Sequence, residues 1–515
     1  MIYSIHLIHL GSRKANLTFE DQTKITNKIQ RADIVDRNGN FLAKTVSSID
    51  IGINPVEVID KTKLLLNLRY IFPEKNYEIV QDKLKKKKFF WFEKKISAEN
   101  YEKIMALGDK AIRPEEKLTR IYPQKNLFSH IIGQIDDDNI GISGLEKSLD
   151  TELKKDKNPI KLTVDKDIQF LIREELVKYN KIFQTKGSAA ILMNVHNGEI
   201  ISLLSLPDFD PNKRLLITDV NYINRATKGV YELGSVFKTF TLAAGFHEGV
   251  IEPETKFKDL EKKIRCGKNT ISEYDDDIPT NLTAEEILIR SGNIGSIRIA
   301  QLIGIEKFKQ FMKQLNLIDP IQFDIEEVGT PVPFKWGKCK LATASYGHGI
   351  TTTILQLANA YSIIVNGGYK ISPTLVKKKV NSSYKQILKN DVSKKINPIL
   401  RKIVTTKEGT ASLANIQGYE VGGKTGTAQK SEIGGYSKNK INTFASIFPS
   451  SSPKFAFIVM LDEPKTNSEY IYNYRDGSDV KYKGTPFNTA GWTTVEVVGQ
   501  ILEKIGPILA TKYNE

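Results

Sequence analysis

The chain has 515 residues, of which 40% are hydrophobic and 26% are charged, and its formal net charge is +15. A single core stops growing at roughly 250–300 residues, so two or more domains are expected, and the composition excludes a wholly disordered, collagen-like or coiled-coil protein. Its lysines are scattered along the whole chain, so the basic balance fits nucleic acid, an anionic membrane surface or simply a lysine-rich protein.

The first ten residues, MIYSIHLIHL, are apolar but much shorter than the about 20 residues that a spanning helix needs. The sequence as written therefore predicts no membrane crossing. Two interpretations stay open: a soluble protein, or a periplasmic protein whose anchor was lost upstream through truncation or a late start assignment. We interpret residues 1–29 as a residual membrane-proximal segment, with a frayed terminus or a first strand as alternatives.

Residues 30–157 carry short apolar stretches broken by turn signals at 36–39 and 136–139, which predicts a strand-rich, irregular region. The run Lys85–Lys88 precedes four aromatic residues. A solvated face or a hairpin explains this run better than a patch for membranes or nucleic acid, because no nucleic-acid-binding motif accompanies it.

Residues 158–510 show a regular alternation of patterns. Asp165 is a candidate cap for an amphipathic helix with Ile168, Leu171, Ile172 and Leu176 on one face. Strands are predicted on either side of the His-Asn-Gly turn at 196–198 and of the turn at 450–453, with helical patterns between the two hairpins and over 493–508. The order predicts an α/β domain built on an antiparallel sheet.

Cys266 and Cys339 lie far apart and form no CxxC pair, so the sequence supports neither a metal site nor a disulfide scaffold. They fit a reducing and an oxidising compartment equally well. The histidines are scattered and contain no HExxH, which argues against a zinc hydrolase. We expect no metal and no cofactor.

An SxxK motif places a hydroxyl and an amine on one helix face. It occurs at Ser235, Ser382, Ser437 and Ser451, but only Ser235 follows a glycine and opens an apolar helical pattern. The positive end of a helix favours developing oxyanion charge, which makes Ser235 a candidate nucleophile with Lys238 as its partner. Taken alone, Ser235 is explained better as a helix cap than as a nucleophile.

Two further motifs follow in order. Ser291-Gly-Asn293 begins 56 residues after Ser235, and Lys424-Thr425-Gly426 begins another 133 residues on. This trio is the signature of class A β-lactamases and penicillin-binding proteins. Residues 418–425 also satisfy the P-loop pattern, but a P-loop needs a helix after its lysine, and no helix-forming face starts at Thr425.

Together with these three motifs, further segments of the chain resemble a class B penicillin-binding protein. The resemblance spans about residues 30 to 505, and its further blocks are RADIVDRNG (31–39), RIYPQKNLFSHIIGQID (120–136), GISGLEKSLD (141–150), ILMNVHNGEIISLLSLPDFDPN (191–212), ATASYGHGI (342–350) and GTPFNTAGW (484–492). The last two favour the division-type enzyme, FtsI, over the elongation type. Ala32, Lys125 and Leu233 depart from the family pattern, but none is a reacting group.

The resemblance implies an α+β multidomain fold. It assigns residues 30–157 to a pedestal (dimerisation-type) domain and 158–515 to a transpeptidase domain, with a central antiparallel sheet flanked by helices and an all-helical subdomain. It also implies a D,D-transpeptidase that acts through an acyl-serine and is inhibited by β-lactams. The alternatives are an elongation-type enzyme, a serine β-lactamase or β-lactam sensor, and an inactive division scaffold.

The resemblance also assigns roles to residues. Ser235 is the nucleophile, Lys238 the base, and Ser291 a proton relay, while the backbone N–H groups of Ser235 and Thr427 form the oxyanion hole. The residues assigned to substrate binding are Asn293, Lys424, Thr425, Gly426 and Thr427. The implied partners are peptidoglycan stem peptides, β-lactams, a membrane glycosyltransferase and other division proteins, and no nucleic acid. The implied location is the bacterial inner membrane, with the catalytic domain in the periplasm.

Overall fold

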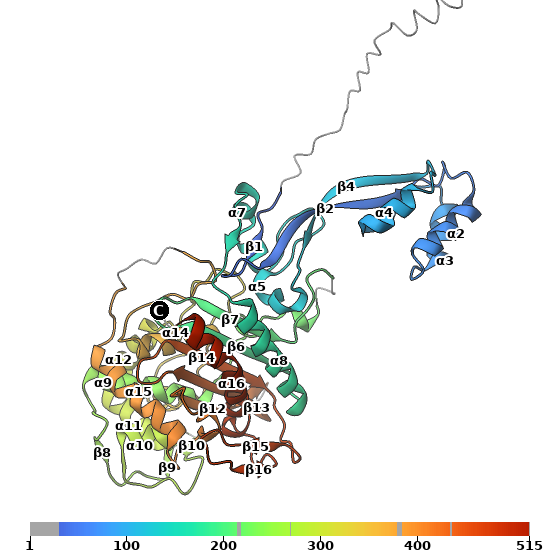
Figure 1. Ribbon diagram of the computed structural model, residues 1–515. Coiled ribbons are helices and arrows are strands. Elements are labelled where there is room, and N and C mark those ends of the chain that lie inside the picture. The colour runs from blue at the N-terminus through green and yellow to red at the C-terminus, as the bar shows by residue number, and fades with distance from the viewer. Residues whose placement is uncertain (1–29, 214–217, 268, 379–383, 433–434, 514–515) are drawn as a thin grey trace, which may run out of the picture. The chain divides into compact units, whose positions relative to one another are not determined.

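The computed structural model describes residues 30–513 apart from 214–217, 268, 379–383 and 433–434 (Figure 1). This part of the chain divides into two compact units, the first comprising 30–33, 44–121 and 151–158 and the second comprising 34–43, 122–150 and 159–513. The boundary predicted between a pedestal domain (30–157) and a transpeptidase domain (158–515) remains a prediction. The apolar run 1–10 lies outside the described residues, and within them no helix is long and apolar enough to cross a membrane.

The first unit combines a small sheet with short helices. Residues 44–53 of β2 (Phe41–Ile53) pair antiparallel with β3 (Phe90–Ile96) and β4 (Ile112–Ile121). The helices are α2 (Lys61–Ile71), α3 (Tyr77–Lys85) and α4 (Ala98–Met105). Their buried side chains form one apolar cluster with those of the sheet. Lys85 to Lys88 are exposed, as a solvated face requires.

These three helices were not predicted. Each has only 8 to 11 residues, too few for a clear helical period. Their starts are defined instead by side chains that accept hydrogen bonds from first-turn N–H groups, namely those of Asp60, Asn76 and Ser97.

A buried antiparallel sheet organises the second unit (Figure 1). Its strand order is β12 (Gly422–Glu432), β13 (Gly435–Phe448), β14 (Phe455–Asp462), β6 (Gly187–Asn194) and β7 (Ile200–Leu206). Both predicted hairpins are confirmed, and they join through the pairing of β14 with β6. The two hairpins, far apart in the sequence, therefore form one sheet.

Helices pack against this sheet. α8 (Lys166–Ile182) and α16 (Thr494–Lys512) contact each other and the strands, and α14 (Ile354–Val365) contacts β6 and β14. α8 begins where predicted, because the Asp165 side chain accepts hydrogen bonds from the N–H groups of Asp167 and Ile168. The predicted helical block contains α9 (Phe237–Glu248), α10 (Ala284–Ile289), α11 (Asn293–Ile303), α12 (Ile305–Gln314), α13 (Lys338–Ala344) and α15 (Asn390–Thr405).

Short strands and short α-helices also occur in the described chain. They are β1 (Ile34–Val35), β5 (Ile160–Lys161), β8 (Lys256–Phe257), β9 (Lys263–Cys266), β10 (Asn269–Ser272), β11 (Leu282–Thr283), β15 (Ile471–Asn473), β16 (Lys481–Lys483), α5 (Ser129–Ile132), α6 (Gly144–Ser148) and α7 (Asp150–Lys155).

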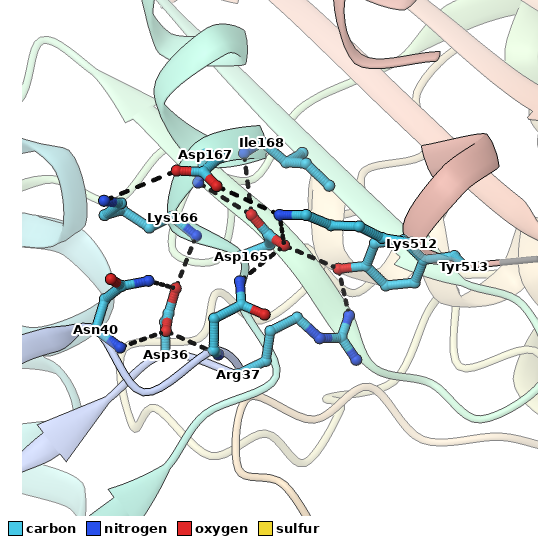
Figure 2. A network of polar contacts seen from close by, with 10 residues as sticks. Asp36, Arg37, Asn40, Asp165, Lys166, Asp167, Ile168, Lys512 and Tyr513 are labelled. Atoms are coloured by element: carbon cyan, nitrogen blue, oxygen red, sulfur yellow. Dashed lines mark hydrogen bonds and ion pairs between the residues drawn. The ribbon is translucent and has the colours of Figure 1, made fainter. Parts of the chain in front are cut away.

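A polar network joins the turn after β1 to the start of α8 and to the end of α16 (Figure 2). The Lys166 N–H donates to Asp36 (3.1 Å), and the Asn38 side chain donates to Asp165 (3.1 Å). The ammonium of Lys512, at the end of α16, donates to the same Asp165 carboxylate (3.2 Å). Residues 34–39 thus act within this unit as an anchor for the two helices that pack on the sheet.

A buried ion pair fixes the β15–β16 segment on α16. Arg475 donates to both carboxylate oxygens of Glu496 at 2.9 Å, and the two side chains are 3% and 0% exposed. Tyr470 donates to the same carboxylate at 2.7 Å. Because both charged groups are removed from water, the stability of each charge depends on the opposite charge beside it.

Replacing Arg475 with methionine is expected to lower the free energy of unfolding by about 3–5 kcal/mol, because the Glu496 carboxylate stays buried without its cation. Urea unfolding followed by circular dichroism measures this change. The matched control is Glu469→Gln, which breaks an exposed pair with Lys483 and should change stability by less than about 0.5 kcal/mol. Equal losses in the two variants would contradict the importance of burial.

Candidate active site

Ser235 lies in a tight turn, η3 (Gly234–Val236), directly before α9. Ser235 is half-buried, and its two neighbours in the chain are buried. A Cβ on Gly234, whose φ is +61°, would come within 2.8 Å of the Thr427 carbonyl oxygen, so the turn packs tightly on β12. The N-cap of α9 is Val236, and Ser235 is therefore not the helix cap that it could have been from sequence alone.

Lys238 lies in the first turn of α9 and is only 1% exposed. Its Nζ donates to the backbone carbonyl of Ser291 and to the Ser291 hydroxyl at 3.2 Å. Ser291 belongs to the turn between α10 and α11 and has φ +59°, a left-handed conformation that non-glycine residues rarely adopt. The backbone strain at this position is consistent with a functional site.

Lys424 reaches the same hydroxyl from the sheet. It lies on β12 and is completely buried, and its Nζ donates to Ser291 Oγ at 2.9 Å and to the Thr425 carbonyl at 3.1 Å. The three motifs thus meet at one point, where the hydroxyl of Ser291 contacts two amines. β12 continues as a strand to Glu432, so the P-loop alternative lacks the helix that it requires.

The electrostatics of this cluster follow from its burial. Burial lowers the pKa of Lys238 to about 7, and the negative charge of Glu273 partly opposes this effect. Burial, together with the charge of Lys238, also holds the pKa of Lys424 well below its ordinary value. Near neutral pH the cluster therefore provides a neutral amine that can accept a proton.

The cluster borders a cavity of about 610 Å³. Of the predicted site residues, Ser235, Ser291, Asn293, Thr425 and Thr427 line this cavity. The buried amines of Lys238 and Lys424 lie behind this lining and reach it through Ser291. A Cβ at Gly426 would come within 2.2 Å of the Leu233 carbonyl oxygen, so only glycine allows β12 to approach the Ser235 turn this closely.

Of the other SxxK serines, the structure describes Ser437, which lies on β13, and Ser451. Ser451 lies in the turn between β13 and β14 and donates to Glu420, and Ser382 lies outside the described residues. The structure also places Glu232, Tyr274 and Tyr474 at the cavity, which no motif indicated, and Tyr346 and Trp492, which lie in the blocks 342–350 and 484–492. Within the described ranges, no group of three or more His, Cys, Asp or Glu residues could hold a metal ion.

The structure pairs the two cysteines, whose oxidation state the sequence left open. Cys266 on β9 and Cys339 on α13 form a disulfide. They are 73 residues apart, and such a separation carries no spacing signal. Only the packing of the helical block brings them together.

Comparisons with known proteins identify the family. Residues 188–479 match the model of the penicillin-binding protein transpeptidase domain, and residues 26–182 match the penicillin-binding protein dimerisation domain. The crystal structure of penicillin-binding protein 3 from Mycobacterium tuberculosis, complexed with aztreonam, has the same fold, with a TM-score of 0.70 at 21% identity over 94% of this chain and 96% of that one. Fold and site together define a penicillin-binding serine transpeptidase.

Similar proteins of known sequence indicate the subclass of penicillin-binding protein. The probable peptidoglycan D,D-transpeptidase FtsI of Caulobacter vibrioides is 31% identical over 94% of this chain and 82% of its own length. Stage V sporulation protein D of Bacillus subtilis is 30% identical over 88% and 76%. The peptidoglycan D,D-transpeptidase FtsI of Buchnera aphidicola is 28% identical over 90% and 88%. The chain belongs to the class B penicillin-binding proteins, and it is FtsI-like.

Proposed function

We propose that this chain cross-links the stem peptides of peptidoglycan during septal cell-wall synthesis, through an acyl-serine at Ser235. The observation that carries the proposal is the convergence of Lys238 and Lys424 on the Ser291 hydroxyl, at the edge of the cavity that Ser235 lines. The names of the FtsI relatives support the substrate and the division role. The aztreonam complex of the structural relative supports β-lactams as ligands.

Acylation begins when neutral Lys238 takes the proton of the Ser235 hydroxyl. The Ser235 oxygen then attacks the carbonyl carbon between the two terminal D-alanines of a stem peptide. The N–H groups of Ser235 and Thr427 stabilise the resulting oxyanion. The C–N bond breaks, Ser291 relays a proton from Lys238 to the leaving amine, and the last D-alanine departs. The acyl group stays on Ser235.

Transfer completes the reaction. The amine of a neighbouring stem peptide attacks the acyl carbon and loses a proton to Lys238. The ester bond to the Ser235 oxygen then breaks, the new amide remains, and Lys238 returns the proton to Ser235. We assign the substrate's backbone amide to the Asn293 side chain. Its terminal carboxylate is assigned to the hydroxyls of Thr425 and Thr427 and to the positive potential of Lys424.

We further propose that the catalytic domain works in the periplasm, beside an inner membrane, with a membrane glycosyltransferase and other division proteins as partners. The disulfide Cys266–Cys339 supports an oxidising compartment, because such bonds persist there and are rare in the cytosol. The match to the dimerisation domain supports a pedestal role for the N-terminal region.

The test is a cross-linking assay with the full chain and a glycan polymer that carries pentapeptide stems. Release of one D-alanine for each cross-link is the expected result. Rapid turnover of nitrocefin without cross-links would favour a β-lactamase instead. Formation of a stable penicillin adduct without any cross-link would point to a β-lactam sensor.

A further inference from the structure

The hairpin β9–β10 leads directly into Glu273, which contacts the start of α11. The Asn293 N–H donates to one Glu273 carboxylate oxygen at 2.6 Å, and the Ile294 N–H donates to the other at 2.9 Å. The first four N–H groups of a helix have no partner within it. Glu273 therefore satisfies two of these groups, and its charge also suits the positive helix end.

The helix offers no such cap itself. Its N-cap residue, Gly292, has no side chain, and its first turn contains no acidic residue. The position at which α11 begins is therefore defined by a carboxylate from another segment. Two further contacts join the same segments: the Asn293 side chain donates to the Ser272 carbonyl at 2.9 Å, and the Tyr274 hydroxyl donates to the Arg290 carbonyl at 3.0 Å.

The start of α11 matters because Ser291 lies only two residues before it. Ser291 has a strained, left-handed backbone, so its conformation depends on the contacts on either side. On one side Lys238 and Lys424 bind its hydroxyl, and on the other Glu273 fixes the helix that follows. A loss of the Glu273 cap would release one side of this turn.

The hairpin is itself held in place by a covalent bond. Cys266, the last residue of β9, pairs with Asn269 of β10 and is bonded to Cys339 on α13. α13 leads into Tyr346, Gly347 and His348, which line the catalytic cavity. The disulfide thus joins two segments that border the same cavity.

We infer that Glu273 is a positioning residue for acylation, which holds the Ser291 hydroxyl between the two lysines, and that the Cys266–Cys339 disulfide holds the hairpin that carries Glu273. The inference rests on the acyl-serine chemistry proposed above. It predicts two separable effects of Glu273, one of geometry and one of charge.

The charge effect distinguishes positioning from general stability. Within the described residues, two charge effects act in this cluster. The carboxylate of Glu273 acts on Lys238, and the charge of Lys238 acts on Lys424 of β12. The negative charge of Glu273 raises the pKa of Lys238. Its removal therefore lowers this pKa, and the pH at which acylation reaches half its maximal rate moves downward.

The experiment measures the rate constant of acylation by benzylpenicillin as a function of pH for Glu273→Gln. We expect the maximal rate constant to fall about five- to thirtyfold, which corresponds to one or two kcal/mol, together with a lower midpoint pH. Glu273→Asp should keep the midpoint, because it keeps the charge. The matched control is Glu261→Gln, which removes a carboxylate that pairs with Arg298 farther along α11, and it should change neither quantity.

A second variant tests the covalent part. The double replacement Cys266→Ser with Cys339→Ser should lower the maximal rate constant, and its effect should not add fully to that of Glu273→Gln. The inference is overturned if Glu273→Gln leaves the rate constant and the midpoint unchanged, or if it lowers only the rate and the melting temperature. Should Glu273→Gln fail to fold, Glu273→Asp and the double serine variant decide by the same two quantities. An unmodified parent protein would instead contradict the proposed function.

Discussion

Replacement of Ser235 with alanine is expected to abolish the covalent adduct that the protein forms with benzylpenicillin. The reason is chemical, because in the proposed mechanism the adduct is an ester of the Ser235 oxygen, and alanine has no oxygen to acylate. Loss of a catalytic nucleophile lowers rates by about 10⁴-fold or more. Intact-mass spectrometry of parent and variant, incubated side by side, measures the fraction of acylated chains.

The control is Ser451→Ala, the same change at another serine of an SxxK motif. Ser451 lies in the β13–β14 turn and donates to Glu420, so the variant should form the adduct as the parent does. An adduct of unchanged yield on Ser235→Ala protein would refute the assignment of the nucleophile. Absence of the adduct from the parent as well would shift the weight to an inactive division scaffold.

The parts of the fold that the sequence predicted are those with strong local patterns. The hairpin at 196–198 combines a His-Asn-Gly turn with apolar runs, and α8 combines the Asp165 cap with a regular apolar face. Each signal lies within about 20 residues, where local geometry decides the outcome. The SxxK motif is equally local, since Ser235 lies in η3 and Lys238 in the first turn of the helix that follows it.

The remaining features depend on contacts between distant segments. Glu273 and Cys266 lie in a stretch without a motif, and their partners Asn293 and Cys339 are brought to them only by the packed helical block. The left-handed conformation of Ser291 likewise follows from its neighbours, because a serine has no preference for it. Such features have no signature in a single sequence.

The hydrogen bonds of two lysines to one hydroxyl affect the protonation states of both amines. Two ammonium groups in a buried site repel each other, and water is not available to screen them. The cluster therefore favours a state in which Lys238 or Lys424 is neutral, and the proton can pass through Ser291 between them. Binding of a substrate carboxylate near Lys424 adds a negative charge, which favours a charged Lys424 and a neutral Lys238.

Acylation by benzylpenicillin is expected to accelerate with rising pH through about 7, the value to which burial lowers the pKa of Lys238. Below this pH the ammonium form dominates and cannot take the proton of Ser235, whereas above it the neutral amine is present and the rate reaches a plateau. Stopped-flow or quenched mass measurements across this range give the midpoint.

Lys238→Met should acylate at least about 10²-fold more slowly at every pH, because the general base is absent. Lys238→Arg should do the same, since a guanidinium stays protonated in proteins. A rate in the parent that does not change with pH, or normal acylation of Lys238→Met protein, would remove Lys238 as the base and leave Lys424, across the Ser291 hydroxyl, as the remaining amine.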